Sequence, residues 1–531
     1  MREQTDRLSG LTPMAVPGLG EKARAWAFPA GVTALFVLAL ILRLHGLNDA
    51  PIWTDEAFTA IVARLPMKVL PFGRIDNHPP LYYLVQHLWQ SLFPGLDAVR
   101  IPAAVIAALT VPVMALAGGD LISKRAGLTA GLFLALSTIH NAFGQEARMY
   151  SLTCLGLILA LWGVAGCLRN DRSRLHAALY VVGGVIAVYS HAIGLFFLAA
   201  VGATAGLAIL MGENPRPRFI RFAALNAVLL VLVLPWLIAL PDNAATFPGL
   251  SRAGPDLIPY LVMNAIGYPG LEPLLMRLAT LTLIALIGYG VFRRWKAGDR
   301  VLVLLLMGSL ILYPVLIAAL SLRVNLIANR VFLPCTLSAA LLVALALEEI
   351  KGRLWRNLAL IALATTGLAS TVIEQALRMK VENVPFSLDA AARKGFASGP
   401  VIGCGMFGTI STHLLAPQRP AYYLLGSSFV RFNDRYEKTF AMPINDHRTV
   451  SAEALDRFAG GGLKVADAAA EFAPFDKVVV LTTYCDATRL APTHATLSAL
   501  GYVEAGEAAP PTLRPTLEVN AWPTELWLRK P

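Results

Sequence analysis

The chain has 531 residues, of which 56% are hydrophobic and only 15% charged, and its mean hydropathy is +0.60. A soluble domain carries about 25% charged residues to solvate its surface, so this composition excludes a large soluble enzyme and a disordered scaffold. The net charge of +11 comes from short basic clusters between apolar runs, which is typical of a membrane protein rather than of a nucleic-acid binder.

Eleven apolar runs are long enough to cross a membrane, since a span needs roughly 20 mostly apolar residues. They lie near residues 27–47, 98–118, 126–143, 151–168, 176–190, 192–211, 219–240, 273–292, 301–321, 331–348 and 357–374. The first run lacks a small-residue cleavage pattern, so we interpret it as a retained anchor. We expect a polytopic α-helical membrane protein with about eleven transmembrane helices.

Residues 79–93 form a shorter apolar run whose leucines share one helical stripe, with Gln86, His87, Gln90 and Ser91 opposite. This pattern predicts a helix lying in the membrane interface rather than a span. With eleven spans, the N-terminal tail and the loops of one side hold nineteen Lys and Arg, against seven in the loops of the other. The positive-inside rule then predicts a cytoplasmic N-terminus.

The odd number of spans places the C-terminal tail on the outer, periplasmic side. We expect residues 1–384 to form the transmembrane module, with an outer loop and juxtamembrane helices at 48–97, and residues 385–531 to form a small α/β domain. Strand-like runs at 401–404, 477–483 and 525–529 alternate with helix-like stretches at 452–458 and 493–500. Cys404 and Cys485 follow two of these strands, and a disulfide bridge and two free thiols both remain open.

The first outer loop contains Asp55 and Glu56 at the start of a helical pattern. One interpretation is structural, with Thr54 as the N-cap and two carboxylates favoured by the helix dipole. The other is functional, because carboxylates at the membrane surface are costly and usually have a role. A carboxylate held rigidly at a helix terminus is compatible with both interpretations.

Three further polar groups share the outer side. His78 and Tyr82 flank Pro79 and Pro80, the second outer loop holds Glu146, Arg148 and Tyr150, and Arg330 precedes a Leu-Pro step at Leu333. His191 lies at the outer end of a span. Each has a bland alternative, such as interfacial anchoring for the tyrosines and snorkelling for the arginine. The sequence contains neither a Walker loop nor a matched pair of broken half-spans, which disfavours a transporter.

The order and sidedness of these motifs resemble the GT-C superfamily of membrane glycosyltransferases, which includes the aminoarabinose transferase of lipid A modification and the protein O-mannosyltransferases. The resemblance rests on Asp55-Glu56, His78-Pro79-Pro80-Leu81, Arg100 at the head of the second span, and the run from Glu146 to Tyr150. Arg330 before Leu333-Pro334 and a final strand containing Trp527 complete it. The chain departs from the superfamily in having Glu146 where a second aspartate is common, and in its short outer tail.

The resemblance implies a multi-pass protein of a bacterial inner membrane. It also implies the transfer of one sugar from a polyprenyl-phosphate carrier to an outer-face glycan, lipid or protein acceptor, with no nucleic acid involved. We expect Asp55 to act as the general base of an inverting reaction, assisted by Glu56 and Glu146. A neighbouring residue on a helix is turned about 100° away, so Glu56 is expected to orient the acceptor or brace an arginine such as Arg148. The residues expected to bind the donor phosphate or substrate are His78, Tyr82, Arg148, Tyr150, His191 and Arg330.

We assign no metal ligand, although Mg²⁺ or Mn²⁺ between Asp55 and Glu146 is a second mechanism that the residues leave open. Two alternative functions share the predicted membrane topology. A lipid-linked sugar flippase has no need of paired outer acids, and a polysaccharide polymerase or ligase commonly depends more on outer-loop arginines.

Overall fold

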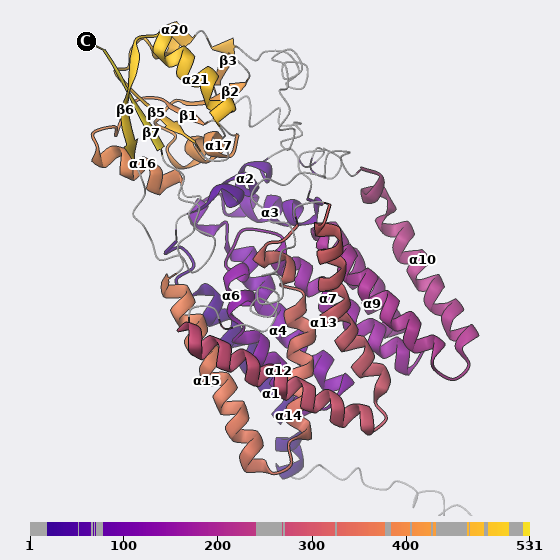
Figure 1. Ribbon diagram of the computed structural model, residues 1–531. Helices are drawn as coiled ribbons and strands as arrows, with labels where there is room; N and C mark the ends of the chain where they lie inside the picture. The colour runs from indigo at the N-terminus through magenta and orange to yellow at the C-terminus, as the bar shows by residue number, and fades with distance from the viewer. Residues whose placement is uncertain are drawn as a thin grey trace, which may run out of the picture.

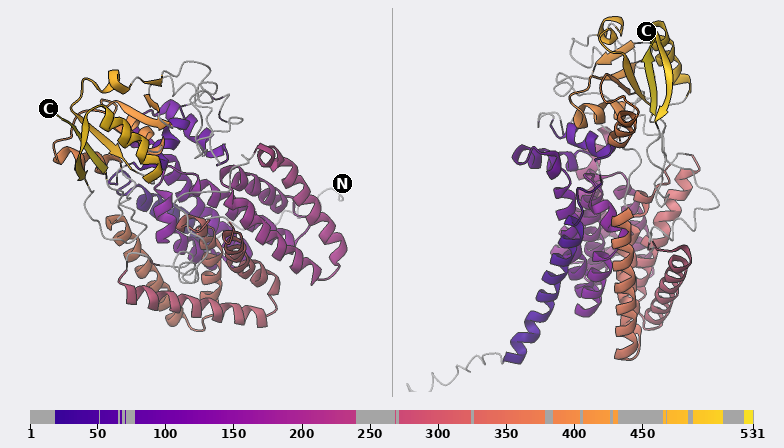
Figure 2. Two further views of the ribbon diagram at one scale, coloured as in Figure 1. Left: turned by 45° about the horizontal axis from the view of Figure 1, so that its top comes forward. Right: turned by 90° about the vertical axis from the view of Figure 1, so that its left-hand side faces the viewer.

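The computed structural model describes residues 19–50, 52–64, 67, 70, 78–239, 268, 271–323, 326–377, 384–403, 406–425, 428–431, 465–466, 468–482, 487–508 and 524–530. It consists of a bundle of long helices with a smaller α/β unit above one end (Figure 1). Viewed from the side, the beginning of α1 (Leu19–Leu44) and the α/β unit lie at opposite ends of the molecule (Figure 2).

Eight helices in the described part of the chain are long and apolar enough to cross a membrane. Seven are α1, α7 (Tyr150–Arg169), α9 (Ile193–Leu210), α10 (Pro215–Ala239), α12 (Pro273–Lys296), α13 (Arg300–Ser321) and α15 (Arg353–Leu377). The eighth runs through η1 (Leu96–Ala98) and α4 (Ile101–Leu121). The chain is therefore a multi-pass membrane protein.

The other three expected spans are shorter or broken. Residues 126–143 form two helices, α5 (Lys124–Ala135) and α6 (Thr138–Gly144), bent by 61° at the break between them. Helix α8 (Arg174–Ser190) has 17 residues and α14 (Cys335–Glu349) has 15. The count of eleven spans stays a prediction, because only a membrane can show whether these three segments cross it.

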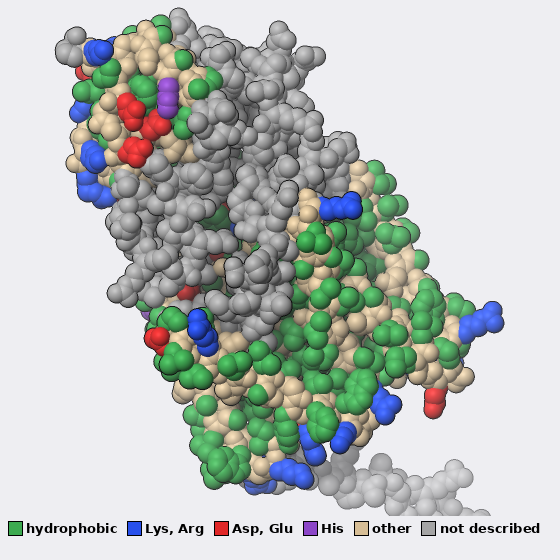
Figure 3. Space-filling view, in the orientation of Figure 1, with side chains coloured by type: hydrophobic (Ala, Val, Ile, Leu, Met, Phe, Trp, Pro, Cys, Tyr) green, Lys and Arg blue, Asp and Glu red, His purple; other side chains and the backbone are tan. Residues whose placement is uncertain are grey.

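The flank of the bundle, which would face lipid, is apolar. Figure 3 shows hydrophobic side chains over its flank, with the visible Lys and Arg of the bundle mainly near its lower edge. Val231, Leu281 and Ile361 are among the exposed residues. Inside the bundle, α7 and α8 approach closely, because a side chain at Gly163 would collide with the backbone of Tyr180.

Two short helices cover the end of the bundle that faces the α/β unit: α2 (Thr54–Val62) and α3 (Leu81–Leu92). The leucine stripe of α3 is exposed at Leu88 and Leu92, whereas Gln86 and Gln90 are buried. This orientation fits a helix that lies in the membrane interface and turns its apolar face to lipid.

The C-terminal unit contains a seven-stranded sheet in the order β4-β3-β2-β1-β5-β7-β6. The central strand β1 runs parallel to β2 and β5, and the other neighbouring pairs are antiparallel. The strands are β1 (Val401–Gly403), β2 (Ala421–Leu425), β3 (Ser428–Arg431), β4 (Val465–Ala466), β5 (Lys477–Leu481), β6 (Tyr502–Ala508) and β7 (Thr524–Arg529). The helices beside them are α16 (Val384–Arg393), α17 (Met406–Leu415), α20 (Ala468–Phe472) and α21 (Ala487–Ala499).

The strand-like runs at 401, 477 and 525 are β1, β5 and β7, and the helical stretch at 493–500 belongs to α21. The stretch at 452–458, Cys404 and Cys485 lie outside the described residues. Helix α17 contacts α2, and Leu414 of α17 packs on a small cluster that contains Ala60, Val99 and Ala147. The α/β unit is thereby attached to the same outer helix that carries Asp55.

Candidate active site

Helix α2 fixes the two adjacent acids of the first outer loop. The helix begins at Thr54 and Trp53 is its N-cap. The predicted N-cap, Thr54, is therefore the first residue of the helix. The reason is Glu56, whose carboxylate accepts a hydrogen bond from the backbone N–H of Trp53 at 3.3 Å. Asp55 and Glu56 therefore both occupy the first turn, where the helix dipole stabilises negative charge.

Glu56 is fully buried and joins three separate segments. Its carboxylate accepts two hydrogen bonds from Arg100, at 2.8 Å from Nε and 2.6 Å from Nη2. It also accepts one from the backbone N–H of Ala147 in the second outer loop, at 2.9 Å. Arg100 in turn donates to the carbonyls of Leu47 and Ala50. Through these contacts the Glu56–Arg100 pair holds α2, the start of the second span and the loop at Ala147 together.

Arg148 binds the same helix as Asp55. Its guanidinium donates to the Asp55 carbonyl at 3.3 Å and to the Thr59 hydroxyl at 3.1 Å. Its Nη2 lies 3.7 Å from Asp55 Oδ2, and the Asp55 side chain keeps 20% of its surface exposed. The described contacts thus join Glu56 to Arg100, and Arg148 to Asp55, which differs from the expected contact between Glu56 and Arg148.

An aromatic row connects the second outer loop with two histidines. Tyr150 lies between Phe143 and His191, with ring centroids 5.1 Å and 5.8 Å away. His78 meets His191 edge to face at 4.9 Å. Three of the residues expected to bind substrate, His78, Tyr150 and His191, are therefore brought together from segments far apart in the sequence.

Tyr82 lies on the buried side of α3 and is fully buried. Its hydroxyl accepts a hydrogen bond from Gln86 at 2.9 Å, and Gln86 also donates to the carbonyl of Val99. Burial raises the pKa of Tyr82; the hydrogen bond from Gln86 opposes this, and the charges of Glu56 and Glu146 add to it. The phenol stays neutral at physiological pH and within electrostatic range of both acids.

Arg330 approaches the site from the late part of the chain. It lies half-buried in the short helix η2 (Asn329–Phe332), which is held by a hydrogen bond from the Tyr313 hydroxyl to the carbonyl of Val331. The Tyr150 hydroxyl lies within electrostatic range of Arg330, Arg148, Asp55 and Glu146. The charges of both acidic loops and of Arg330 therefore act on the same side chain, Tyr150.

The described residues contain no group of three or more His, Cys, Asp or Glu side chains that could hold a metal ion. Glu146 is buried and Asp55 partly exposed, so these two carboxylates would need a further ligand to bind Mg²⁺. We assign no step to a metal.

Sequence reasoning missed the roles of Thr59 and Gln86 and gave Arg100 no function of its own. Thr59 follows Asp55 by four residues on one helix, so it lies on the same face. A guanidinium at the head of an apolar span was a second usable signal, because a buried cation requires a partner. Gln86 had been assigned to the solvent face of α3.

Comparison with solved structures gives two close architectural matches. The structure of ArnT from Cupriavidus metallidurans in the apo state superimposes with a TM-score of 0.58 at 14% identity, covering 96% of this chain and all (100%) of that one. The same protein bound to undecaprenyl phosphate gives 0.55 at 14% identity, covering 94% and 99%. The chain has the fold of the GT-C membrane glycosyltransferases.

Part of the sequence also matches a family model. Residues 77–238, which include α3 and nearly all of α10, match the family model described as dolichyl-phosphate-mannose-protein mannosyltransferase. The comparison with curated proteins gives no match. The matched segment contains Arg100, Glu146, Arg148, Tyr150 and His191.

Proposed function

We propose that this protein is an integral membrane glycosyltransferase that moves a single sugar from a polyprenyl-phosphate carrier to an acceptor on the outer face of the inner membrane. The observation that carries the proposal is the arrangement around Asp55. A partly exposed carboxylate at a helix N-terminus lies 3.7 Å from the Arg148 guanidinium, and Arg148 also donates to the Asp55 carbonyl and the Thr59 hydroxyl. The GT-C fold and the family match support it.

Asp55 acts as the general base in this mechanism. It takes the proton from the acceptor hydroxyl as the hydroxyl oxygen bonds to the anomeric carbon of the sugar. The bond from that carbon to the carrier phosphate breaks on the opposite side, which inverts the configuration. Its electron pair leaves with the phosphate, and Arg330 stabilises the charge that develops there through charge-assisted hydrogen bonds.

The remaining residues position the reactants. His78, His191, Tyr150 and Tyr82 contact sugar hydroxyls or carrier phosphate, and Glu146 binds the acceptor. Glu56 is a positioning residue, because its contacts with Arg100 and Ala147 hold α2 against the second outer loop. The donor is already activated as a phosphate ester, so the mechanism requires no nucleotide.

The test is Asp55→Asn in protein reconstituted with labelled polyprenyl-phosphate pentose, hexose and uronic acid donors. A general base contributes about 10²–10⁴-fold to the rate, so transfer should fall by at least about 100-fold while carrier binding survives. Asp97→Asn, an exposed acid of the same outer loop, serves as the matched control. Retained transfer in Asp55→Asn would remove the base assignment. Mass spectrometry of envelope glycolipids and glycoproteins after gene deletion identifies the sugar and the acceptor.

A further inference from the structure

Arg43 is a charged residue buried inside the membrane bundle. It lies in the last turn of α1, one of the long apolar helices, and is fully buried. Its side-chain partners among the described residues are three backbone carbonyls and His140, and none of them is a carboxylate. A charge inside a membrane segment is costly and usually has a function, yet the proposed mechanism gives Arg43 no role.

The carbonyls that Arg43 binds lie where the third expected span is broken. The guanidinium donates to Leu134 at 3.4 Å and to Ala135 at 3.5 Å, which are the last two residues of α5, and to Ala39 of its own helix at 3.1 Å. Carbonyls at the end of a helix have no partner within that helix. They also carry the negative end of the helix dipole, which favours a nearby cation. The end of α5 therefore stabilises the buried charge.

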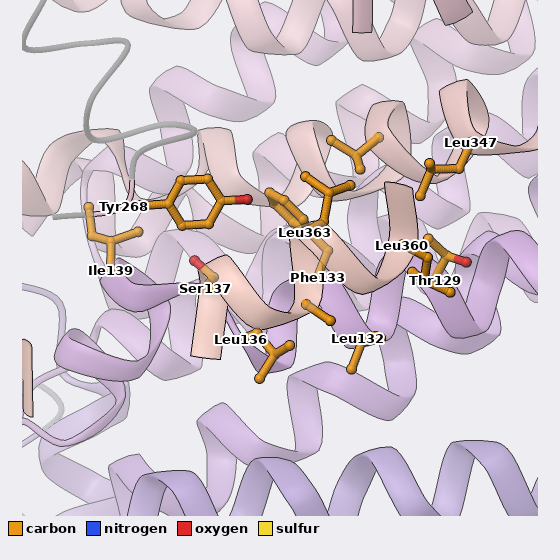
Figure 4. A pocket seen from close by; sticks show the side chains of 13 residues that line it. Thr129, Leu132, Phe133, Leu136, Ser137, Ile139, Tyr268, Leu347, Leu360 and Leu363 are labelled. Carbon is orange, nitrogen blue, oxygen red and sulfur yellow. The ribbon is translucent and has the colours of Figure 1, made fainter. Parts of the chain in front are cut away.

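Further polar side chains complete the bend between α5 and α6. Thr371 of α15 donates to the carbonyl of Leu136 at 3.0 Å. Ser137 is the N-cap of α6, and its hydroxyl accepts from the backbone N–H of His140 at 3.4 Å. Figure 4 shows Leu136, Ser137 and Ile139 of the bend beside the small apolar pocket that they line. Irregular backbone at membrane depth is tolerated only where the protein satisfies it, so these contacts fix the 61° bend.

His140 connects the guanidinium to the other side of the bend. Arg43 Nη2 lies 2.8 Å from His140 Nδ1, and His140 belongs to the first turn of α6. A guanidinium can only donate, so Nδ1 accepts and the neutral imidazole carries its proton on Nε2. The planar fork of Arg43 thus holds the last turn of α5 and the first turn of α6 at once, which fixes the angle between the two helices.

Helix α6 leads from this bend into the second outer loop and is held by α1 at both ends. Gln145, directly after α6, donates to the carbonyls of Arg43 at 3.1 Å and of His45 at 2.7 Å. Gly144 is closely packed, because a Cβ there would lie 2.9 Å from the Ala107 Cβ and 3.5 Å from Arg43 Nε. The end of α1 therefore determines where the second outer loop begins.

The second outer loop brings three groups to the candidate site within three residues. Glu146 is the residue assigned to the acceptor, and the Ala147 amide and the Arg148 guanidinium both bind residues of α2. A shift of α6 would move all three relative to Asp55. Arg330 belongs instead to η2, much later in the chain.

We propose that Arg43 is a positioning residue of the transfer reaction, which places Glu146 and Arg148 against Asp55 by fixing α6. This inference rests on the proposed function, in which Glu146 binds the acceptor and Arg330 binds the donor phosphate. A displaced α6 weakens acceptor binding and leaves the contribution of Arg330 to donor binding unchanged. A variant that is merely less stable has less active protein and unchanged KM values, so the two KM values separate positioning from stability.

The kinetic test is Arg43→Met, which keeps an apolar side chain and removes the charge and the donors. The donor is the labelled polyprenyl-phosphate sugar that the wild-type protein accepts, and envelope membranes from the gene-deletion strain are titrated as the source of unmodified acceptor. A misplacement of 1 Å can cost about 10²-fold, so the apparent KM for these membranes should rise at least about tenfold, with an unchanged KM for the donor. Arg43→Lys should recover only part, because lysine lacks the planar fork.

Arg169→Met is the matched control. Arg169 also lies in the last turn of its helix, α7, and it donates to the carbonyls of Asp120 and Leu121 at the end of another helix, α4. That end of α4 is opposite to the end at Arg100. Arg169→Met should therefore leave both KM values unchanged.

Hydrogen–deuterium exchange provides a readout that does not depend on transfer. The Ala147 amide is bonded to the buried Glu56 carboxylate, so peptides that cover residues 145–150 should exchange about tenfold faster in Arg43→Met and at the wild-type rate in Arg169→Met. His140→Leu removes the same contact from α6 and carries the test where Arg43→Met does not fold. Because the two variants act through one contact, the double variant should raise the acceptor KM less than the product of the two single effects.

Four outcomes would overturn the inference. These are unchanged exchange of residues 145–150 in Arg43→Met, faster exchange with an unchanged acceptor KM, an equal rise of the donor KM, and an equal rise of the acceptor KM in Arg169→Met. Faster exchange in Arg43→Met, together with no transfer by the wild-type protein from any donor, would instead overturn the proposed function alone.

Discussion

Asp55 and Glu56 are adjacent in the chain, yet they differ in solvent exposure and in the arginine that each contacts. The Asp55 side chain is 20% exposed beside Arg148, and Glu56 is fully buried with its carboxylate on Arg100 and the Ala147 amide. The cause is helical geometry, which turns successive side chains about 100° apart. Asp55 keeps a partly exposed carboxylate beside Arg148, and Glu56 holds the two loops together.

The Glu56–Arg100 pair should be essential for stability. Breaking a buried ion pair on one side costs about 3–5 kcal/mol, because the remaining charge stays buried. We expect Glu56→Gln and Arg100→Ala each to lower the unfolding temperature in detergent and to reduce transfer. The combined variant should cost less than the sum of the two.

Arg221→Ala is the matched control for this pair. Arg221 forms an ion pair with Asp171 in which the two side chains are 44% and 27% exposed, and ion pairs at the surface contribute about 0–1 kcal/mol. An equal shift of the unfolding temperature in Arg221→Ala and Arg100→Ala would contradict the structural role.

Arg330 should affect the chemical step more than acceptor binding. Removing a preorganised charge donor costs about 10²–10³-fold in kcat, so Arg330→Ala should lose transfer on that scale, with an unchanged KM for the acceptor. Arg330→Lys should recover only part, because lysine lacks the bidentate fork. The control is Arg323→Ala, an exposed arginine of the same outer segment. Equal losses in the two arginine variants would place the donor phosphate elsewhere.

At the scale of elements, the predictions drawn from the periodicity of apolar residues were the most reliable. The helix at residues 81–92 and the strands at 401, 477 and 525 followed from local pattern, and the position of that helix in the membrane interface stays a prediction. The break after Leu136 was missed, because a serine N-cap inside a mostly apolar run such as residues 126–143 is a weak signal. The contact between Glu56 and Arg100 joins residues 44 positions apart, and no local pattern encodes such a pairing.

The contact between α17 and α2 should couple the α/β unit to catalysis. Leu414 packs on the cluster of Ala60, Val99 and Ala147, which belongs to the elements that hold Asp55 and Arg148. Leu414→Asp should therefore lower kcat at least several-fold. Gln418→Asp, on the exposed loop after α17, should leave kcat unchanged. Unaltered transfer in Leu414→Asp with a folded α/β unit would show that the contact has no part in positioning.

At the scale of the whole molecule, the sidedness of the chain determines on which side of the membrane the reaction occurs. The bundle carries its basic loops at one end and the α/β unit above the other, which agrees with an outer catalytic face (Figures 1 and 3). The odd number of spans and the charge bias together predict a cytoplasmic N-terminus and a periplasmic sheet.

Cysteine labelling in intact cells tests this orientation. Cys154, Cys167 and Cys335 are buried and should not react with an aqueous reagent, so only Cys404 and Cys485 need replacement. A cysteine at Val430 in β3 should react with an impermeant maleimide from outside. A cysteine at Gly352, in the loop between α14 and α15, should react only after permeabilisation. The reverse pattern would invert the topology and remove the outer-face reaction.

The network around Glu56 also has a consequence for biosynthesis. Its members Leu47, Glu56, Arg100 and Ala147 all lie within the first 150 residues, whereas Arg330 follows much later. Because the ribosome delivers the spans in order, every segment of this network is complete before α8 is made. The segment that carries Arg330 becomes available only after α13 has been made. Co-expressed fragments divided between the network and this segment should therefore reassemble, since each one already contains its own internal contacts.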